Sequence, residues 1–189
     1  MKKFLLIIAV VLGLTASVNA QVKTSGFKLI GSLGLGVSWA NVGVNVTDFG
    51  KDSESAFGFI NPHGELTAGV NVIPNIFIGI GLGYDARCGV SNAKGTTQNE
   101  LRVPAHVRFY TTPERGSGII IDVKGGYSRL FVSGGGFNGG NLFVGPGYMF
   151  GGCALSLGYE GSFFRVIKNE AGNLSYNFHG ISARFTYEF

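Results

Sequence analysis

Apolar and polar side chains alternate along most of this chain. In segment 76–87, one face carries Ile76, Ile78, Ile80, Leu82, Tyr84 and Ala86, and the other carries Phe77, Gly79, Gly81, Gly83, Asp85 and Arg87. Alternation at period two is typical of a β-strand whose two faces meet different surroundings. Segments of this kind cover residues 26–40, 57–72, 76–87, 99–110, 118–130, 140–150, 153–164 and 174–189. The pattern therefore predicts an all-β fold of eight strands.

The lengths of these segments and of their connections favour a membrane. Most segments exceed the ~5–6 residues of a soluble strand and suit the ~9–11 residues of a tilted transmembrane strand. We expect long connections at 41–56, 88–98, 131–139 and 165–173, short ones at 73–75 and 151–152, and an intermediate one at 111–117. Outer-membrane barrels have short periplasmic turns and longer outer loops. We therefore predict an eight-stranded antiparallel up-and-down transmembrane β-barrel whose N-terminus is periplasmic.

Aromatic residues lie near both ends of the apolar face. We expect Trp39, Tyr84, Tyr127, Tyr159 and Phe163 at the outer interface, and Phe109, Tyr148, Phe150, Phe185, Tyr187 and Phe189 at the periplasmic one, as in the aromatic girdles of membrane barrels. The alternative is a soluble sandwich or lipocalin-like barrel with the apolar face inside. That fold needs bulky side chains in its core, but the opposite face here carries Gly, Ser, Thr and charges.

The first twenty residues have the form of a secretory signal peptide. Met1-Lys2-Lys3 precedes an apolar run over 4–14, and Val18-Asn19-Ala20 offers a cleavage site. We predict a signal peptide at 1–20 and a barrel domain at 21–189; an uncleaved anchor is the alternative, but the run is short for a spanning helix. The formal net charge of +4 includes Lys2 and Lys3, and no basic cluster follows. No nucleic-acid partner is predicted.

The polar face of the strands carries charges of both signs. They are Glu65, Asp85, Arg87, Glu100, Arg102, Arg108, Asp122, Lys124, Glu160, Arg184 and Glu188. Side chains fill the interior of an eight-stranded barrel, and buried charges need partners. We expect a packed network rather than a charged pore, with residue 87 opposite 100 and residue 85 opposite 102 across the 88–98 connection. That register pairs Arg87 with Glu100 and Asp85 with Arg102.

Two prolines and two cysteines add local expectations. Pro104 and Pro146 lie inside strands and lack the N–H of a ladder bond, so each predicts a bulge or local irregularity. Cys88 and Cys153 fall at opposite ends of the barrel, beyond the ~7 Å Cα separation that a disulfide tolerates. We predict free thiols.

The chain ends Phe185-Thr186-Tyr187-Glu188-Phe189. Together with the signal ending at Ala20, the glycine-alternating strands and the strand start at 101–105, this ending resembles the outer membrane protein β-barrel domain family of Gram-negative bacteria, which includes PorT-like members. The resemblance implies an outer-membrane location, contact with the lipid of that membrane, and Phe185, Tyr187 and Phe189 as the signal for the barrel-insertion machinery.

The sequence offers no catalytic or metal site. Barrels that resemble lipid A deacylases place a serine two residues after a lipid-facing histidine, but Ile181 follows His179 at that spacing and Ser182 falls on the other face. His63 precedes Gly64 in a turn-like position, and His106 is expected to point inward. These scattered groups lack metal-ligand spacing. We expect that the protein is not an enzyme and that it binds no cofactor.

The sequence favours a structural or surface-binding role through outer loops. The 41–56 connection is the best candidate, with Asp48, Lys51, Asp52 and Glu54 as possible contacts. The surface partner stays unknown. A component of an export or assembly machine, and a lipid-modifying enzyme, are the alternative functions.

Overall fold

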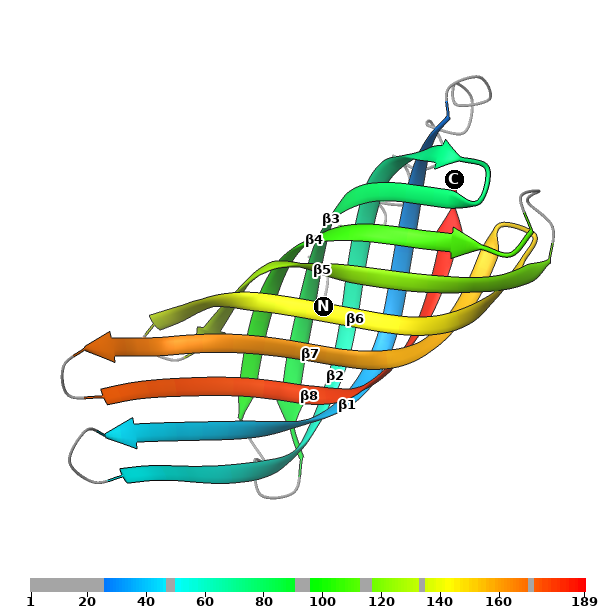
Figure 1. The fold of residues 1–189 in the computed structure, drawn as a ribbon. Helices are drawn as coiled ribbons and strands as arrows, with labels where there is room; N and C mark the ends of the chain where they lie inside the picture. The colour runs from blue at the N-terminus through cyan, green and yellow to red at the C-terminus, as the bar shows by residue number, and fades with distance from the viewer. Residues whose placement is uncertain (1–25, 47–49, 91–95, 113–116, 133–134, 170–171) are drawn as a thin grey trace, which may run out of the picture.

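The chain folds into one closed antiparallel barrel (Figure 1). The structure, a computed structural model, describes residues 26–46, 50–90, 96–112, 117–132, 135–169 and 172–189. Its strands are β1 (Phe27–Val46), β2 (Gly50–Ile73), β3 (Ile76–Gly89), β4 (Thr97–Tyr110), β5 (Gly118–Val132), β6 (Gly135–Phe150), β7 (Cys153–Asn169) and β8 (Gly172–Glu188). Each strand pairs with its neighbours in sequence, and β1 pairs with β8. The predicted eight-stranded up-and-down barrel is confirmed.

The residues outside this description include the signal peptide expected at 1–20, which stays a prediction. Within the described part of the chain, no helix has the length and apolar character needed to cross a membrane.

The strands are staggered around the barrel axis. A row of paired residues leaves β1 at Val42 and returns to β1 at Ser32, ten residues nearer its start. The row passes through Tyr176, Phe164, Gly139, Ser128, Arg102, Gly83 and Glu65. Such a stagger requires the strands to tilt against the axis. We call the end with 74–75, 151–152 and Phe189 the turn end, and the opposite end the hairpin end.

The predicted strands are too short at the hairpin end. The 41–56 connection expected as the longest loop is mostly strand, since β1 and β2 stay paired as far as Val46 and Gly50. Likewise 131–139 and 165–173 shrink to the two residues that separate β5 from β6 and β7 from β8. The predicted contrast between long outer loops and short turns is therefore wrong. Glycine and polar residues in these segments suggested loops, but antiparallel pairing carries the strands through them.

The prolines interrupt pairing without changing the register. Pro104 pairs opposite Gly126 in the β4–β5 ladder, whereas no pair joins 103–104 to β3. Pro146 pairs opposite Ile121, and no pair joins 145–146 to β7. The expected local irregularity is therefore a gap in pairing on one side rather than a bulge, because the missing N–H affects only one neighbouring strand. Register shifts occur instead between Ser38 and Ala40, Asn71 and Ile73, and Arg165 and Ile167.

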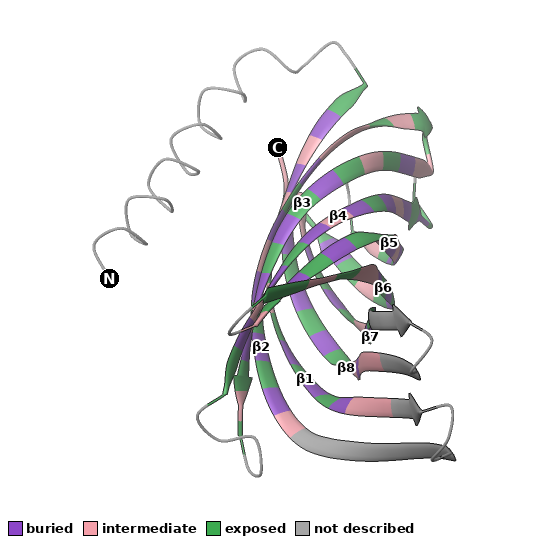
Figure 2. Cartoon of the chain, turned by 90° about the vertical axis from the view of Figure 1, so that its left-hand side faces the viewer, coloured by how far each residue is buried: buried purple, intermediate pink, exposed green. Residues whose placement is uncertain are grey.

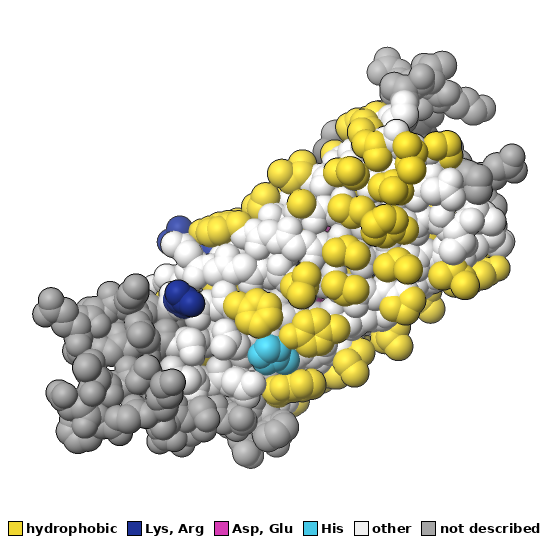
Figure 3. All heavy atoms as spheres, in the orientation of Figure 1, with side chains coloured by type: hydrophobic (Ala, Val, Ile, Leu, Met, Phe, Trp, Pro, Cys, Tyr) yellow, Lys and Arg dark blue, Asp and Glu magenta, His cyan; other side chains and the backbone are white. Residues whose placement is uncertain are grey.

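The barrel carries its apolar side chains on the outside. Burial alternates along the strands (Figure 2), and apolar side chains gather on the surface (Figure 3). Leu33 is 69% exposed and Leu157 60%, whereas Arg108 and Glu100 are fully buried. The predicted aromatic girdles face outward as well, with Trp39, Tyr84 and Tyr127 exposed towards the hairpin end and Phe109 and Phe185 towards the turn end. The soluble alternative is therefore wrong, because it requires the opposite distribution.

Both cysteines are free, as predicted. Cys88 is exposed near the hairpin end of β3, and Cys153 begins β7 at the turn end.

Inward-facing glycines let the strands approach closely. A Cβ atom on Gly145 would lie 2.7 Å from the Cα atom of Gly158 and 2.7 Å from the carbonyl oxygen of Leu157. Backbone atoms of a paired strand cannot move aside as the end of a flexible side chain can. Gly135, by contrast, has no atom within 4 Å of its ideal Cβ position.

We expect Gly145→Val to lower the free energy of unfolding by about 3 kcal/mol or more, because overpacking alone costs about 1–3 kcal/mol. Gly135→Val is the matched control and should stay within about 0.5 kcal/mol of the wild type. Urea titration, with the folded fraction read as the fast-migrating band of unboiled gel samples, measures both. Equal midpoints for the two variants would contradict the close contact between Gly145 and β7.

Candidate functional site

The inside of the barrel holds a charge-balanced set of side chains. The structure places all eleven charged residues of the polar face there and adds Lys28, which the sequence analysis missed. Lys28 shares the even-numbered face of β1 with Gly34 and Ser38, and this parity could have identified it. Among the side chains that the structure describes, six acidic and six basic ones result. The acidic ones are Glu65, Asp85, Glu100, Asp122, Glu160 and Glu188, and the basic ones are Lys28, Arg87, Arg102, Arg108, Lys124 and Arg184.

Near the turn end, two acids and two bases form one cluster. Arg108 binds Asp122 through two nitrogens, with Nε–Oδ1 2.7 Å and Nη2–Oδ2 2.9 Å. Its third nitrogen, Nη1, lies 3.0 Å from Glu188 Oε1, and Lys28 Nζ lies 3.0 Å from Glu188 Oε2. Asp122 is also 2.9 Å from His106 Nε2 and accepts a hydrogen bond from Ser156 Oγ at 3.0 Å. The predicted inward position of His106 is confirmed.

A second cluster begins at the middle of the barrel. Lys124 Nζ lies 2.6 Å from Glu65 Oε1, and Arg184 Nη1 lies 3.5 Å from Glu65 Oε2. Arg184 Nη2 also binds Glu160 Oε2 at 3.0 Å, and its guanidinium lies 3.9 Å from the ring centre of Phe143. Planar guanidinium groups stack on aromatic faces while their edges donate hydrogen bonds.

The same cluster continues to the hairpin end. Arg102 pairs with Asp85 and Glu160, and Arg87 pairs with Glu100. Ser162 donates a hydrogen bond to Glu100 and accepts one from Arg87. The second cluster thus contains four acids and four bases, so each cluster is neutral by itself.

The register predicted for β3 and β4 is wrong by two residues. Asp85 lies opposite Glu100, and Arg87 lies opposite Gln98. The expected ion pairs Arg87–Glu100 and Asp85–Arg102 nevertheless form, because both arginines reach diagonally across the ladder. Diagonal neighbours on one face lie within the reach of long side chains.

Apolar clusters cover both ends of the network. Ile30, Phe77, Tyr110, Ile120, Met149 and Ala154 form one at the turn end. Ala40, Phe59, Leu130, Phe164 and Phe178 form the other at the hairpin end, and the guanidinium of Arg87 lies 4.0 Å from the ring centre of Phe178. The charges are therefore enclosed on every side by strands or by apolar side chains.

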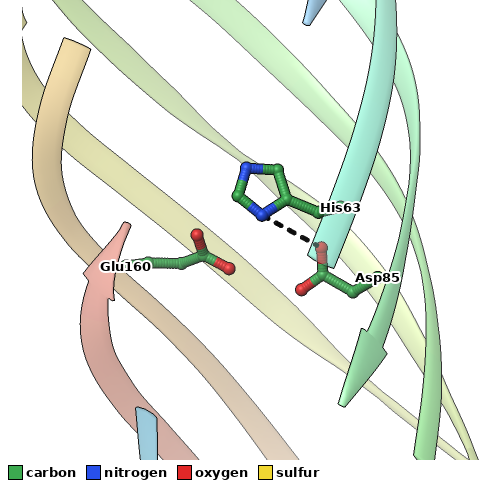
Figure 4. A group of neighbouring side chains, drawn as sticks. All are labelled: His63, Asp85 and Glu160. Atoms are coloured by element: carbon green, nitrogen blue, oxygen red, sulfur yellow. Dashed lines mark ion pairs between the residues drawn. The ribbon is translucent and has the colours of Figure 1, made fainter. Parts of the chain in front are cut away.

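One group inside the barrel has the composition of a metal site. His63, Asp85 and Glu160 bring ligand atoms within 4.8 Å of one another (Figure 4). This corrects the interpretation of His63, which lies buried within β2 rather than at a turn. However, both oxygens of Glu160 already accept hydrogen bonds from Arg102 and Arg184. Two neighbouring guanidinium groups repel a cation, so the donor set does not fit a metal.

His63 also lies between a serine and an aspartate. Ser182 Oγ is 3.4 Å from His63 Nε2, and His63 Nδ1 is 4.0 Å from Asp85 Oδ1. The Nδ1 atom is closer to the backbone oxygen of Asn61, at 3.2 Å. A nucleophile and its base need a hydrogen bond of about 2.6–3.2 Å and access to substrate, but Ser182 is fully buried. This arrangement fits a packed interior better than a reaction site.

His179 lies on the outer surface, as predicted. Its Nδ1 atom is 2.6 Å from the hydroxyl of Tyr159, and its ring packs edge-on against Phe163. Ser182 points into the barrel instead, so the two residues lie on opposite faces.

The other site candidates lie at the two ends of the barrel. Lys51, Asp52 and Glu54 belong to β2 rather than to a loop, and Asp48 lies outside the described residues. At the turn end, Phe185 and Tyr187 are exposed, and the ring centres of Tyr187 and Phe189 lie 4.6 Å apart. Their role as an insertion signal stays a prediction.

No protein-family model and no curated protein matches the chain. Among solved structures, the barrel is similar to Neisserial surface protein A, at 15% identity over 87% of this chain and 98% of that one, with a TM-score of 0.48. It is also similar to the outer membrane protein OprG from Pseudomonas aeruginosa, at 10% identity over 87% and 96%, with a TM-score of 0.47. The outer membrane protease OmpT from Escherichia coli gives 9% identity over 86% and 96%, with a TM-score of 0.41.

These weak likenesses carry no conclusion about activity, and PorT-like membership stays a prediction. The composition of the barrel surface indicates the environment of the protein. Its aliphatic outer band between two aromatic girdles, its polar interior and its even number of antiparallel strands are the properties of bacterial outer-membrane barrels. The chain is an integral β-barrel of the bacterial outer membrane.

We expect Asp122→Asn to lower the free energy of unfolding by about 3–5 kcal/mol, because it leaves the buried Arg108 without its bidentate partner. Adding Arg108→Met should restore part of the loss, since the uncompensated charge is then removed. Arg129→Gln, on the outer surface, is the control and should change the stability by less than about 0.5 kcal/mol. Urea unfolding in phosphatidylcholine vesicles, which carry no net charge, measures all three. A loss for Asp122→Asn as small as that of the control would contradict the pairing.

Proposed function

We propose that this chain is a non-conducting, non-enzymatic outer-membrane barrel that presents the paired ends of its strands as a contact surface outside the cell. The sealed interior is the observation that carries the proposal. Two neutral ion-pair clusters fill the middle, and apolar clusters cover both ends. With the interior filled, the parts open to partners are the outer surface and the two ends.

The hairpin end is the better candidate for contact. The strands continue there beyond the aromatic girdle. β1 extends past Trp39 as far as Val46, and β2 pairs with it from Gly50 onward. Figure 1 shows the β1–β2 and β7–β8 hairpins projecting from one end of the barrel. With Phe27 and Phe189 in the periplasm, these hairpins lie outside the cell. Rigid scaffolds commonly present binding segments in this way.

The charged residues of the β1–β2 hairpin indicate which kind of partner it attracts. Residues 44–54 contain Asp48, Asp52 and Glu54 against the single base Lys51. An excess of acids favours a partner with a cationic surface. The alternatives, an export component and a lipid-modifying enzyme, have no comparable support among the described residues.

The first test is electrical. We expect the purified protein to produce no reproducible single-channel steps in planar bilayers, because ions have no water-filled path through the interior. A wide porin added to the same bilayers is the positive control. A regular unitary conductance from this protein would overturn the closed-barrel part of the proposal.

The second test addresses the hairpin. Protein in phosphatidylcholine nanodiscs is passed over poly-lysine and heparin surfaces, and retention is measured by surface plasmon resonance. We expect retention on poly-lysine but not on heparin, and a several-fold loss at low salt for the triple variant Asp48→Asn, Asp52→Asn, Glu54→Gln. Lys51→Gln is the matched control and should increase retention. Retention that the triple variant does not change would contradict a contact role for 44–54.

A further inference from the structure

The outside of the barrel, as far as the structure describes its side chains, carries charge in one place. Among the side chains that the structure describes, those charged and outside the interior are Arg129 and Arg165, and both are exposed. Arg129 follows the outward-facing Tyr127 by two residues on β5, and Arg165 follows Phe163 by two residues on β7. Two arginines thus lie just beyond the aromatic girdle, towards the hairpin end.

The strand register brings these arginines to the same patch. Arg129 pairs with Asn138 on β6, and Arg165 pairs with Ser175 on β8. Since Gly139 pairs with Phe164, Asn138 lies beside Arg165. The two Cα atoms are therefore two strand spacings apart, or about 10 Å. Arginine side chains from both sides can reach a single group between them.

A hollow of about 500 Å³ lies at Arg165, and Arg129 lies next to its lining, opposite Asn138 in the β5–β6 ladder. Its lining includes Asn138, Phe163, Arg165, Ser175 and Asn177. The side-chain amides of Asn138 and Asn177 and the guanidinium of Arg165 offer hydrogen-bond donors, and the ring of Phe163 provides an apolar side. The hydroxyl of Ser175 already donates to the backbone oxygen of Gly43. This combination suits a ligand with a charged, hydrogen-bonding head and an apolar body.

The two arginines have no acidic partner within the described residues. Neither forms an ion pair there, whereas all twelve interior charges do. The guanidinium of Arg129 lies 5.6 Å from the ring centre of Phe131 instead. These cations are therefore available to an anion from outside the described chain.

We propose that this hollow binds the phosphate-bearing headgroup of an anionic membrane lipid. Arginine binds phosphate through two parallel N–H bonds, and its aliphatic stem lies along apolar surface while the charged end stays at the interface. The lipid's acyl chains continue over Tyr159 and Ile181, which face outward below the hollow. A soluble anion has no use for that apolar surface, so a lipid fits both parts of the site.

Trp39 provides a built-in probe for the test. It is the only tryptophan of the chain, it is exposed, and it pairs with His179 on β8. Two residues further along the same strands, Asn41 pairs with Asn177, and Asn177 lines the hollow. A lipid bound in the hollow therefore places its chains near the indole.

The experiment compares brominated phosphatidylglycerol with brominated phosphatidylcholine in phosphatidylcholine vesicles, reading quenching of Trp39 fluorescence as relative binding. We expect the wild type to prefer the anionic lipid and each of Arg129→Gln and Arg165→Gln to reduce that preference about fivefold. A basic residue near an anionic surface contributes about 1 kcal/mol, and 1.4 kcal/mol is tenfold. The double variant should bind both lipids equally, and Arg165→Lys should keep most of the preference.

Two controls separate a site from general effects. Combining Arg165→Gln with Thr112→Arg restores the net charge at an exposed position of the turn end and should leave the preference reduced. Unchanged mobility of unboiled samples on gels verifies that each variant is folded. The proposal is overturned if the wild type shows no preference, if the double variant keeps it, or if Thr112→Arg restores it.

Discussion

Twelve charges inside a membrane barrel impose the constraint on which the rest of this structure depends. Moving an isolated ion into a medium of low dielectric constant costs of order 20 kcal/mol before relaxation. The chain meets this cost with two clusters that are neutral separately, of four and eight charged groups. The network also constrains the register: a shift by one residue would turn these side chains towards lipid, where each arginine or lysine at the midplane costs about 2–4 kcal/mol.

The glycine content follows from the same network. Arginine and glutamate are long, and eight strands enclose little space. Inward-facing glycines make room for them: a Cβ atom on Gly83 would lie 3.3 Å from Glu65 Cγ, and one on Gly81 would lie 2.9 Å from Thr67 Oγ1. Large polar side chains and glycines therefore share the inner face. The inward-facing part of the glycine content thus reflects space for charge rather than flexibility.

The alternation of side chains between the two faces of each strand made the architecture predictable from sequence. It did not determine the register or the ends of the strands. Period two assigns each residue to a face, so the interior charges and the outward aromatic residues were correctly assigned, and Lys28 could have been. Register is not encoded in parity, because a shift of two residues keeps every side chain on its face. The position of Asp85 opposite Glu100 was therefore missed. The strand ends were missed because glycine and asparagine in 135–140 suggest a loop when read locally, whereas pairing with β5 holds them in a strand.

The distribution of charge gives the two ends of the barrel different properties. Among the described side chains, the outer surface is neutral from the turn end up to the girdle that contains Tyr127 and Phe163, and the two arginines follow directly. The interior needs none of this charge, since its clusters are already neutral. Arg129 and Arg165 therefore do not stabilise the fold through the network. They face the interface between lipid headgroups and water, where a cation interacts with anionic headgroups. The interior charges constrain the fold. The two outer arginines, Arg129 and Arg165, instead affect which lipid headgroups lie next to the folded barrel.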